Sequence, residues 1–191
     1  IKAGFNIAGL DVLEKKNFGN LSTIMTDAIK FASDRKVVIS VVRDKAQTEE
    51  LLFSDQAIIR RQPCSIHTIV ICSTLSPRYL VCLKDRLPES ITLVDAPMSG
   101  ASIAAEEGRL SFMLGGEKEV LDRLDPLFYA MGKHIHRVGP FSSGMTAKVL
   151  NNFCAATSIA STRMVLDWAI NLGIDRSALL DILNDSSGQN W

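Results

Sequence analysis

The sequence lacks the features that mark membrane proteins and nucleic-acid-binding proteins. No apolar run approaches the roughly 18–20 residues of a membrane-spanning helix, and no secretory leader is visible. Basic and acidic side chains number 21 each, so no excess charge favours a nucleic acid or an anionic membrane as a partner. The composition therefore predicts a soluble protein that acts on small molecules, with no nucleic acid and no membrane among its partners.

Cysteine and histidine are too sparse to build a disulfide framework or a metal centre. The four cysteines form no C-x-x-C pair and lie in or beside apolar runs: Cys64, Cys72, Cys82 and Cys154. This pattern indicates buried thiols in a reducing compartment. His134 and His136 can point to one face of a strand, but a zinc site needs further ligands, so we expect no metal. We expect a cytoplasmic protein, or a mitochondrial one if a targeting segment precedes Ile1.

Short apolar runs alternate with helix-compatible stretches along most of the chain. The runs predict strands over residues 5–10, 36–42, 67–72, 91–94, 110–114 and 134–138. Helices are predicted over 21–33, 45–53, from 77 onward and over 118–129. Because strands separated by helices form β-α-β units, the pattern predicts an α/β fold with a mainly parallel sheet and helices on both faces.

The pattern changes after Gly139-Pro140, where two helices are predicted over 143–170 and 175–184. We therefore expect one domain over residues 1–140 and a second, helical domain that begins with residues 141–191. No proline interrupts the first of these two helices.

The sequence lacks the glycine-rich turn that is typical of dinucleotide-binding domains. A dinucleotide-binding sheet normally begins with a strand and a G-x-G-x-x-G turn into a helix that holds the pyrophosphate. The chain has no such turn, because Gly4 and Gly9 have the wrong spacing, and residues 1–4 resemble the last turn of a helix. We expect the first strand and the glycine loop to lie upstream, and these 191 residues to be part of a longer protein.

Candidate binding residues follow the predicted strands, since open parallel sheets bind ligands beyond the carboxyl ends of their strands. Asp11 follows the first strand, Val42 and Arg43 end the second, and Thr74 follows the third. An acidic residue in the position of Asp11 can hold the two hydroxyls of an adenosine ribose and repel a 2′-phosphate. The alternative is an aspartate that only forms a turn.

Two further groups can hold a small oxygen-rich molecule. The corner formed by Ser99 and Gly100 offers backbone N–H groups and a hydroxyl to a carboxylate, although a simple turn is the alternative. Lys148 and Asn152 are four residues apart and so stack on one helical face. There an amine can move a proton while an amide holds a hydroxyl or carboxylate. The alternative for this second pair is a solvated lysine beside a capping asparagine.

Taken together, these residues resemble the β-hydroxyacid dehydrogenase family. The matching blocks cover residues 95–100 (DAPMSG), 108–116 (GRLSFMLGG), 131–132 (MG), 144–152 (GMTAKVLNN) and 186–191 (SSGQNW). Their order and spacing make the match specific, and the last block is similar to the 3-hydroxyisobutyrate dehydrogenase branch. The resemblance implies a Rossmann-type domain, a long interdomain helix and an all-helical domain that closes over the substrate and makes dimer or tetramer contacts.

The resemblance also implies roles for the candidate residues. On the substrate side, Lys148 would be the general acid and base, Asn152 a substrate ligand, and Ser99 with Gly100 the site of the substrate carboxylate. Trp191 would lie near the start of the helical domain.

On the cofactor side, the resemblance implies NAD, with NADP as a second possibility. Thr74 would lie near the nicotinamide and Asp11 near the adenosine ribose, and Val42 and Arg43 complete the cofactor-binding set.

We therefore expect an NAD(P)-dependent oxidoreductase that interconverts a small β-hydroxyacid and its semialdehyde or keto form, as a homodimer or homotetramer in the full-length protein. The alternative is a non-catalytic relative, or a fragment, that serves as an assembly or interaction module, a role open to the 191-residue piece by itself. The presence of Lys148 and Asn152 argues against this alternative for the full-length protein, because an interaction module has no need of such a pair.

Overall fold

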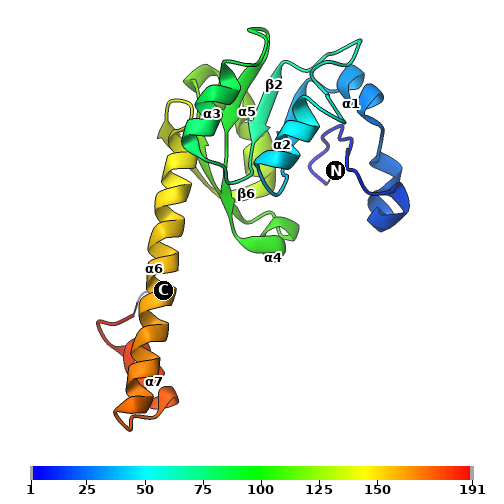
Figure 1. The fold of residues 1–191 in the computed structure, drawn as a ribbon. Coiled ribbons are helices and arrows are strands. Elements are labelled where there is room, and N and C mark those ends of the chain that lie inside the picture. Colours follow the sequence, from blue (N-terminus) through cyan, green and yellow to red (C-terminus); the bar gives the residue numbers. More distant parts are fainter. Residues whose placement is uncertain (1, 190–191) are drawn as a thin grey trace. The chain divides into compact units, whose positions relative to one another are not determined.

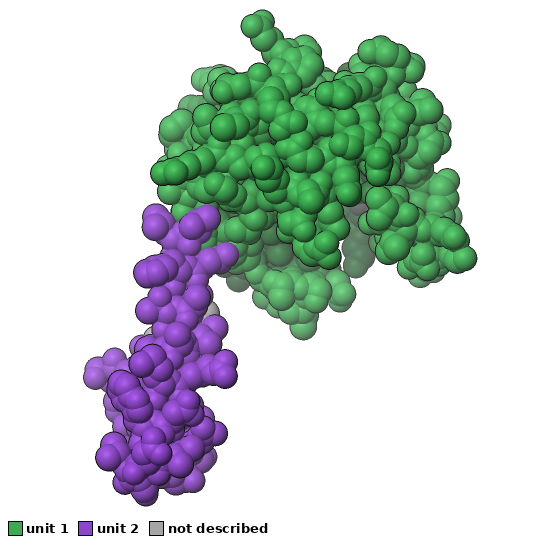
Figure 2. Space-filling model, viewed as in Figure 1, with its two compact units in different colours: residues 1–148 green, residues 149–191 purple. Residues whose placement is uncertain are grey.

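The structure of the chain is a computed structural model that describes residues 2–189. It divides into two compact units, residues 1–148 and residues 149–191 (Figure 2). The first unit is α/β and the second is helical. The last strand ends at Gly139, whereas the units divide further along the chain, inside the long helix α6, Ser143–Asn171. The domain boundary near residue 140 stays a prediction.

The sheet of the first unit is mixed and mainly parallel. Within residues 2–189 its strands are β1 Val37–Ser40, β2 Thr68–Ile71, β3 Thr92–Asp95, β4 Met98–Ser99, β5 Leu110–Gly115 and β6 Gly132–Gly139. The order is β1-β2-β3-β5-β4, and β6 also pairs with β5. β1, β2 and β3 run parallel, as do β5 and β6, while β5 is antiparallel to β3 and β4. The predicted fold class is confirmed, and the short strand β4 is an addition to it.

Two apolar cores lie on the two faces of this sheet, because successive side chains of a strand point to opposite faces. In β2, Ile69 and Ile71 enter a core shared with α1, α2 and α3, whereas Val70 enters a core shared with α4 and α5. Figure 1 shows the helices packed around the sheet of this unit. All four residues of β2 are buried, as expected of a central parallel strand. These helices are α1 Ala28–Asp34, α2 Lys45–Leu52, α3 Pro77–Lys84, α4 Ala101–Glu106 and α5 Lys118–Met131.

The helix predicted over residues 21–33 is instead two elements. A 3₁₀ segment, η1 Lys15–Ile24, precedes α1. The Asp27 side chain accepts a hydrogen bond from the backbone N–H of Lys30 at 2.9 Å and so sets the start of α1. A local cap therefore overrides the longer apolar period.

The strand predicted over residues 5–10 is wrong. Only Gly9 forms a bridge in this segment, with Met25 as its partner. The side chains of Phe5 and Ile7 stay exposed, so burial does not stabilise an extended pairing here.

Two of the four thiols predicted to be buried are exposed. Cys72 is buried in the sheet and Cys64 is half-buried, but Cys82 and Cys154 face solvent on helices. On α3 the core is contacted by Leu80 and Leu83, so Cys82 lies on the outer face of the helix. Burial raises the pKa of the Cys72 thiol to about 12, so this group stays protonated at neutral pH.

The second unit contains most of α6 and the helix α7, Arg176–Asp185. The Asp175 side chain caps α7 by accepting a hydrogen bond from the N–H of Ala178 at 3.0 Å. Large apolar side chains of this unit are exposed, among them Phe153, Trp168 and Leu172. No helix within residues 2–189 is long and apolar enough to cross a membrane. The predicted position of Trp191 lies outside the described residues.

Candidate active site

The ends of β1 and β2 lie side by side, joined by the side chain of Ser73. This buried serine accepts a hydrogen bond at Oγ from the backbone N–H of Val42 at 2.9 Å. Thr74, next in the chain, is exposed, and so is Arg43, whose Nε contacts Asp44 Oδ2 at 3.2 Å. Three of the four predicted cofactor-binding residues, Val42, Arg43 and Thr74, thus lie beyond the carboxyl ends of β1 and β2. This is where open parallel sheets bind their ligands.

Lys148 and Ser99 form the polar centre of the site. Lys148 lies on α6 and is 9% exposed, and its Nζ donates a hydrogen bond to Ser99 Oγ at 2.6 Å. Burial lowers the pKa of the Lys148 ammonium, because desolvation disfavours the charged form. A lysine with a lowered pKa that holds a hydroxyl can accept and donate a proton closer to neutral pH than a solvated lysine can.

Gly100 makes the turn that presents Ser99. Its φ of 135° lies in the region that favours glycine, and a Cβ there would overlap the Cβ of Ala104. Ala101 also has a positive φ, of 55°. Two consecutive residues of this kind reverse the chain between β4 and α4 and leave the serine at the corner.

Asp95 opens the block of residues 95–100, but the sequence alone predicts no role for its side chain. It ends β3 and is fully buried. Its Oδ1 accepts a hydrogen bond from the N–H of Ser142 at 2.7 Å, and its Oδ2 accepts one from the N–H of Met145 at 2.6 Å. Burial raises the pKa of the Asp95 carboxyl, while the two backbone donors act in the opposite direction. The signal in the sequence is an aspartate that follows a predicted strand and opens the block 95–100.

Two glycines permit close approaches around Asp95 and the start of α6: Gly115 on β5 and Gly144 on α6. A Cβ on Gly115 would overlap the carboxylate of Asp95, and a Cβ on Gly144 would overlap the backbone carbonyl of Met113. Helix α6 therefore begins in direct contact with the sheet. This close approach places Lys148 one turn further along the helix.

Asp11 and Asn152 belong neither to the group at the ends of β1 and β2 nor to the Lys148–Ser99 pair, and within residues 2–189 no hydrogen bond joins them to either. Asp11 is exposed in the N-terminal segment, where its Oδ1 accepts from the N–H of Leu13 at 2.9 Å, as turn-forming aspartates do. Asn152 is exposed on α6 and belongs to the second unit. Its spacing from Lys148 on the helix is the one that the sequence predicts.

A dinucleotide fits the edge formed by β1 and β2 in part. The exposed hydroxyl of Thr74 can donate and accept hydrogen bonds, and the exposed guanidinium of Arg43 carries a positive charge. A positive charge suits the phosphates of such a molecule. The glycine turn that would hold the pyrophosphate is not in this sequence.

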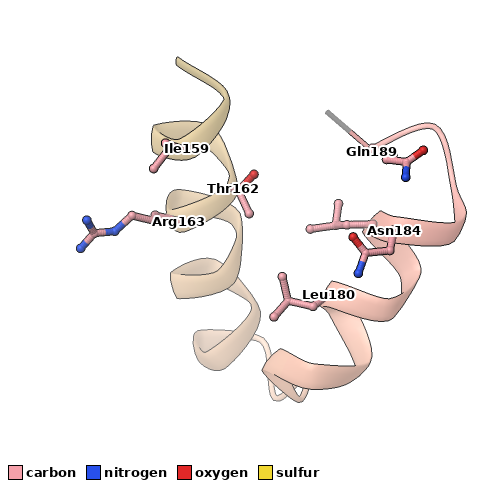
Figure 3. Close-up of a pocket in the computed structure, with 8 residues that line it drawn as sticks. Ile159, Thr162, Arg163, Leu180, Asn184 and Gln189 are labelled. Carbon is pink, nitrogen blue, oxygen red and sulfur yellow. The ribbon is translucent and has the colours of Figure 1, made fainter. Parts of the chain in front are cut away.

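A separate groove of about 260 Å³ lies within the second unit, between α6 and α7 (Figure 3). Its lining is Ile159, Thr162, Arg163, Leu180, Leu183, Asn184, Gly188 and Gln189. The guanidinium of Arg163 points away from α7, so the groove is mainly apolar (Figure 3). No predicted site residue lies in it. No group of three or more histidine, cysteine or acidic side chains within residues 2–189 could hold a metal.

The fold and the site together define a class. A mainly parallel, Rossmann-type sheet with polar residues beyond the carboxyl ends of its strands is the architecture of a dinucleotide-binding domain. Residues 1–139 match the family described as the NAD binding domain of 6-phosphogluconate dehydrogenase. The chain belongs to this family.

The sequence aligns with named dehydrogenases and reductases over most or all of its length. The NAD-dependent L-serine dehydrogenase of Pseudomonas aeruginosa is 32% identical over 197 residues, which cover 100% of this chain and 65% of that protein. The 2-hydroxy-3-oxopropionate reductase of Escherichia coli is 34% identical over 163 residues, covering 85% of this chain and 55% of the relative. The chain thus spans less than two thirds of the length of these relatives.

Solved structures agree on the fold. The 3-hydroxyisobutyrate dehydrogenase of Mycobacterium tuberculosis with L-serine has a TM-score of 0.80 at 23% identity, covering 98% of this chain and 65% of that one. The imine reductase of Myxococcus stipitatus with NAD⁺ has a TM-score of 0.81 at 12% identity, covering 96% of this chain and 65% of that one. At these identities the likeness shows the fold alone.

Proposed function

We propose that the protein containing this chain is an NAD(P)-dependent dehydrogenase that interconverts a small β-hydroxyacid and its semialdehyde or keto form. The observation that carries the proposal is the contact at 2.6 Å between Nζ of the buried Lys148 and Oγ of the half-buried Ser99. Membership of the NAD-binding family supplies the second half of the argument.

In the direction of oxidation, neutral Lys148 takes the proton of the substrate hydroxyl. A nicotinamide bound near Thr74 would supply the acceptor for the hydride that leaves the same carbon, and the substrate alcohol would thereby become a carbonyl group. In the direction of reduction, the Lys148 ammonium returns the proton to the carbonyl oxygen. The lowered pKa of Lys148 makes both protonation states accessible closer to neutral pH than in a solvated lysine.

Ser99 and Gly100 would hold the substrate carboxylate. The Ser99 hydroxyl already accepts a hydrogen bond from Lys148, so its own proton is available to an oxygen of the substrate. Lys148 and the carboxylate site are therefore neighbours, as a short hydroxyacid with its two functional groups close together requires. Asn152 would bind a further substrate oxygen.

The cofactor would lie across the ends of β1 and β2, near Val42, Arg43 and Thr74. Asp11 would face the adenosine ribose and favour NAD. We also propose a homodimer or homotetramer, since the second unit exposes large apolar side chains such as Phe153 and Trp168. Four cysteines without a disulfide suit a cytoplasmic setting.

Hydride transfer tests the proposal. The chain, and a longer protein that contains it, would be incubated with NAD and with L-serine, 3-hydroxyisobutyrate or L-threonate, and the reduced nicotinamide followed by its absorbance. We expect turnover of at least one of these acids by the longer protein. The chain alone should bind dinucleotide weakly, because it has no glycine turn for the pyrophosphate. Absence of turnover with every β-hydroxyacid and both cofactors would favour the assembly role.

A further inference from the structure

We infer that Asp95 is a positioning residue for Lys148: it holds the first turn of α6 against the end of β3 and thereby keeps the Lys148 amine in contact with Ser99. The catalytic meaning of this inference rests on the proposed function. The geometry itself belongs to the first unit, where all of these residues lie.

The Asp95 carboxylate uses both of its oxygens on the start of α6. One accepts from the N–H of Ser142 and the other from the N–H of Met145. Ser142 directly precedes α6 and Met145 lies in its first turn, where backbone N–H groups have no partner within the helix. Met145 precedes Lys148 by three residues, so the two side chains rise from the same side of α6. A movement of the first turn therefore moves Lys148.

Other contacts make this position of α6 specific. Met145 Sδ accepts a hydrogen bond from the N–H of Leu75 at 3.2 Å, and Ser142 Oγ donates one to the carbonyl of Pro77 at 3.3 Å. Ser142 has a φ of 78°, a left-handed conformation that is strained for a residue with a side chain. Such a conformation persists only where the surroundings hold it, and the bond from its N–H to Asp95 is one of the contacts that do so.

The position of Asp95, between two backbone N–H groups, requires a side chain with a carboxylate. Two backbone N–H groups converge on it, and only a carboxylate of this size offers an acceptor to each. An asparagine of the same shape would turn its NH₂ group toward one of the two donors. A negative charge is also favoured at the N-terminus of a helix. Asp95→Asn therefore loosens the first turn of α6 without a change in volume.

The reactivity of Lys148 is the direct measure of its position. Acetic anhydride labels neutral amines, and mass spectrometry of the full 191-residue chain at a series of pH values gives a rate and a titration midpoint for each lysine. Lys133 is exposed on β6 of the same unit and serves as the internal control. Thermal denaturation of each variant sets a labelling temperature well below unfolding.

In Asp95→Asn we expect the plateau labelling rate of Lys148 to rise about tenfold or more, the factor that corresponds to one lost hydrogen bond of a charged group. Its midpoint should move up, toward that of a solvated lysine, while Lys133 stays unchanged. Ser99→Ala should raise the Lys148 rate by itself and add little in the Asp95→Asn background, because both changes act on one contact. An unchanged Lys148 profile in a less stable Asp95→Asn protein would overturn the inference and leave Asp95 as a helix cap only.

Gly115→Ala keeps the inference testable if Asp95→Asn does not fold. The added Cβ would overlap the Asp95 carboxylate and turn it, but it leaves the charge in place. The same rise in Lys148 labelling is expected, and its absence in a folded Gly115→Ala protein would also refute the inference. Labelling does not depend on turnover. Failure of hydride transfer in the wild type would therefore contradict the proposed function without deciding the role of Asp95.

Where the longer protein turns over, kinetics give a second measure of the same role. Asp95→Asn should lower kcat about tenfold or more and leave the KM for NAD unchanged, because Asp95 acts through Lys148 and not on the cofactor. A raised KM for NAD with a normal kcat would contradict this.

Discussion

Replacement of Lys148 separates proton transfer from every other contribution of the site. In Lys148→Ala the group that exchanges a proton with the substrate oxygen is gone, while the edge at β1 and β2 is untouched. Positioned acid-base groups contribute about 10²–10⁴-fold, or roughly 3–5 kcal/mol of transition-state stabilisation. We therefore expect kcat of the longer protein to fall by about 10²–10⁴-fold, with a much smaller change in the dissociation constant for NAD.

Three companion variants give this prediction its controls. Lys148→Met fills the same buried space without an amine, so a loss of activity equal to that of Lys148→Ala would show that the cavity is not the cause. Lys148→Arg can still donate to Ser99, but it cannot act as a base, because a guanidinium does not lose its proton in this pH range. Lys133→Ala removes an exposed lysine of the same unit and should leave kcat within about twofold of wild type. A kcat near wild type in Lys148→Ala would remove Lys148 from the mechanism.

The lowered pKa of Lys148 adds a test by pH. The oxidation rate should rise with pH through that pKa, below the range of a solvated lysine, because the neutral amine is the base. Stability should follow the same group. Between the folded pKa and the ordinary value the unfolded chain binds more protons, so the free energy of unfolding rises with pH in that window. Lys148→Met should lack this rise in chemical denaturation, and an equal slope in both proteins would contradict the assignment.

Three further predictions concern cofactor choice and stability. Asp11 offers a carboxylate where a 2′-phosphate would lie, so titrations of the longer protein should give tighter binding of NAD than of NADP; tighter NADP would refute this. Gly144→Ala should cost about 1–3 kcal/mol in the free energy of unfolding, because its Cβ overlaps the backbone of β5, whereas Gly116→Ala makes ordinary contacts and should cost much less. The Arg86 guanidinium lowers the pKa of Glu49, so stability should fall as the pH drops through that lowered value. Arg86→Met should lose this acid dependence in denaturation at a series of pH values.

The fold class can be predicted from the sequence because apolar residues recur with the spacing that buries one face of a helix or the whole of a central strand. The run Thr68–Ile71 is apolar and β-branched, and it becomes the buried strand β2. The stretch around Lys148 has no proline and becomes the long helix α6. The blocks of residues that identify the family are likewise local.

The apolar pattern does not predict secondary structure correctly where a strand has no pairing partner nearby in the sequence or where a capping residue starts a helix. The segment over 5–10 has the composition of a strand but forms only the bridge between Gly9 and Met25. The stretch over 21–33 has the apolar period of one helix, but Asp27 caps a new helix within it. Both outcomes depend on hydrogen bonds that apolar periodicity does not report.

The site itself is a product of tertiary structure. Ser99 and Lys148 are 49 residues apart in the chain, and Asp95 and Met145 are 50 apart. Each contact forms because β4 turns back along β5 and because α6 begins against the sheet where Gly144 leaves room. The sequence by itself determined which side chains could carry the chemistry. Only the packing of α6 on the sheet decided that a buried carboxylate would anchor the helix from which Lys148 reaches Ser99.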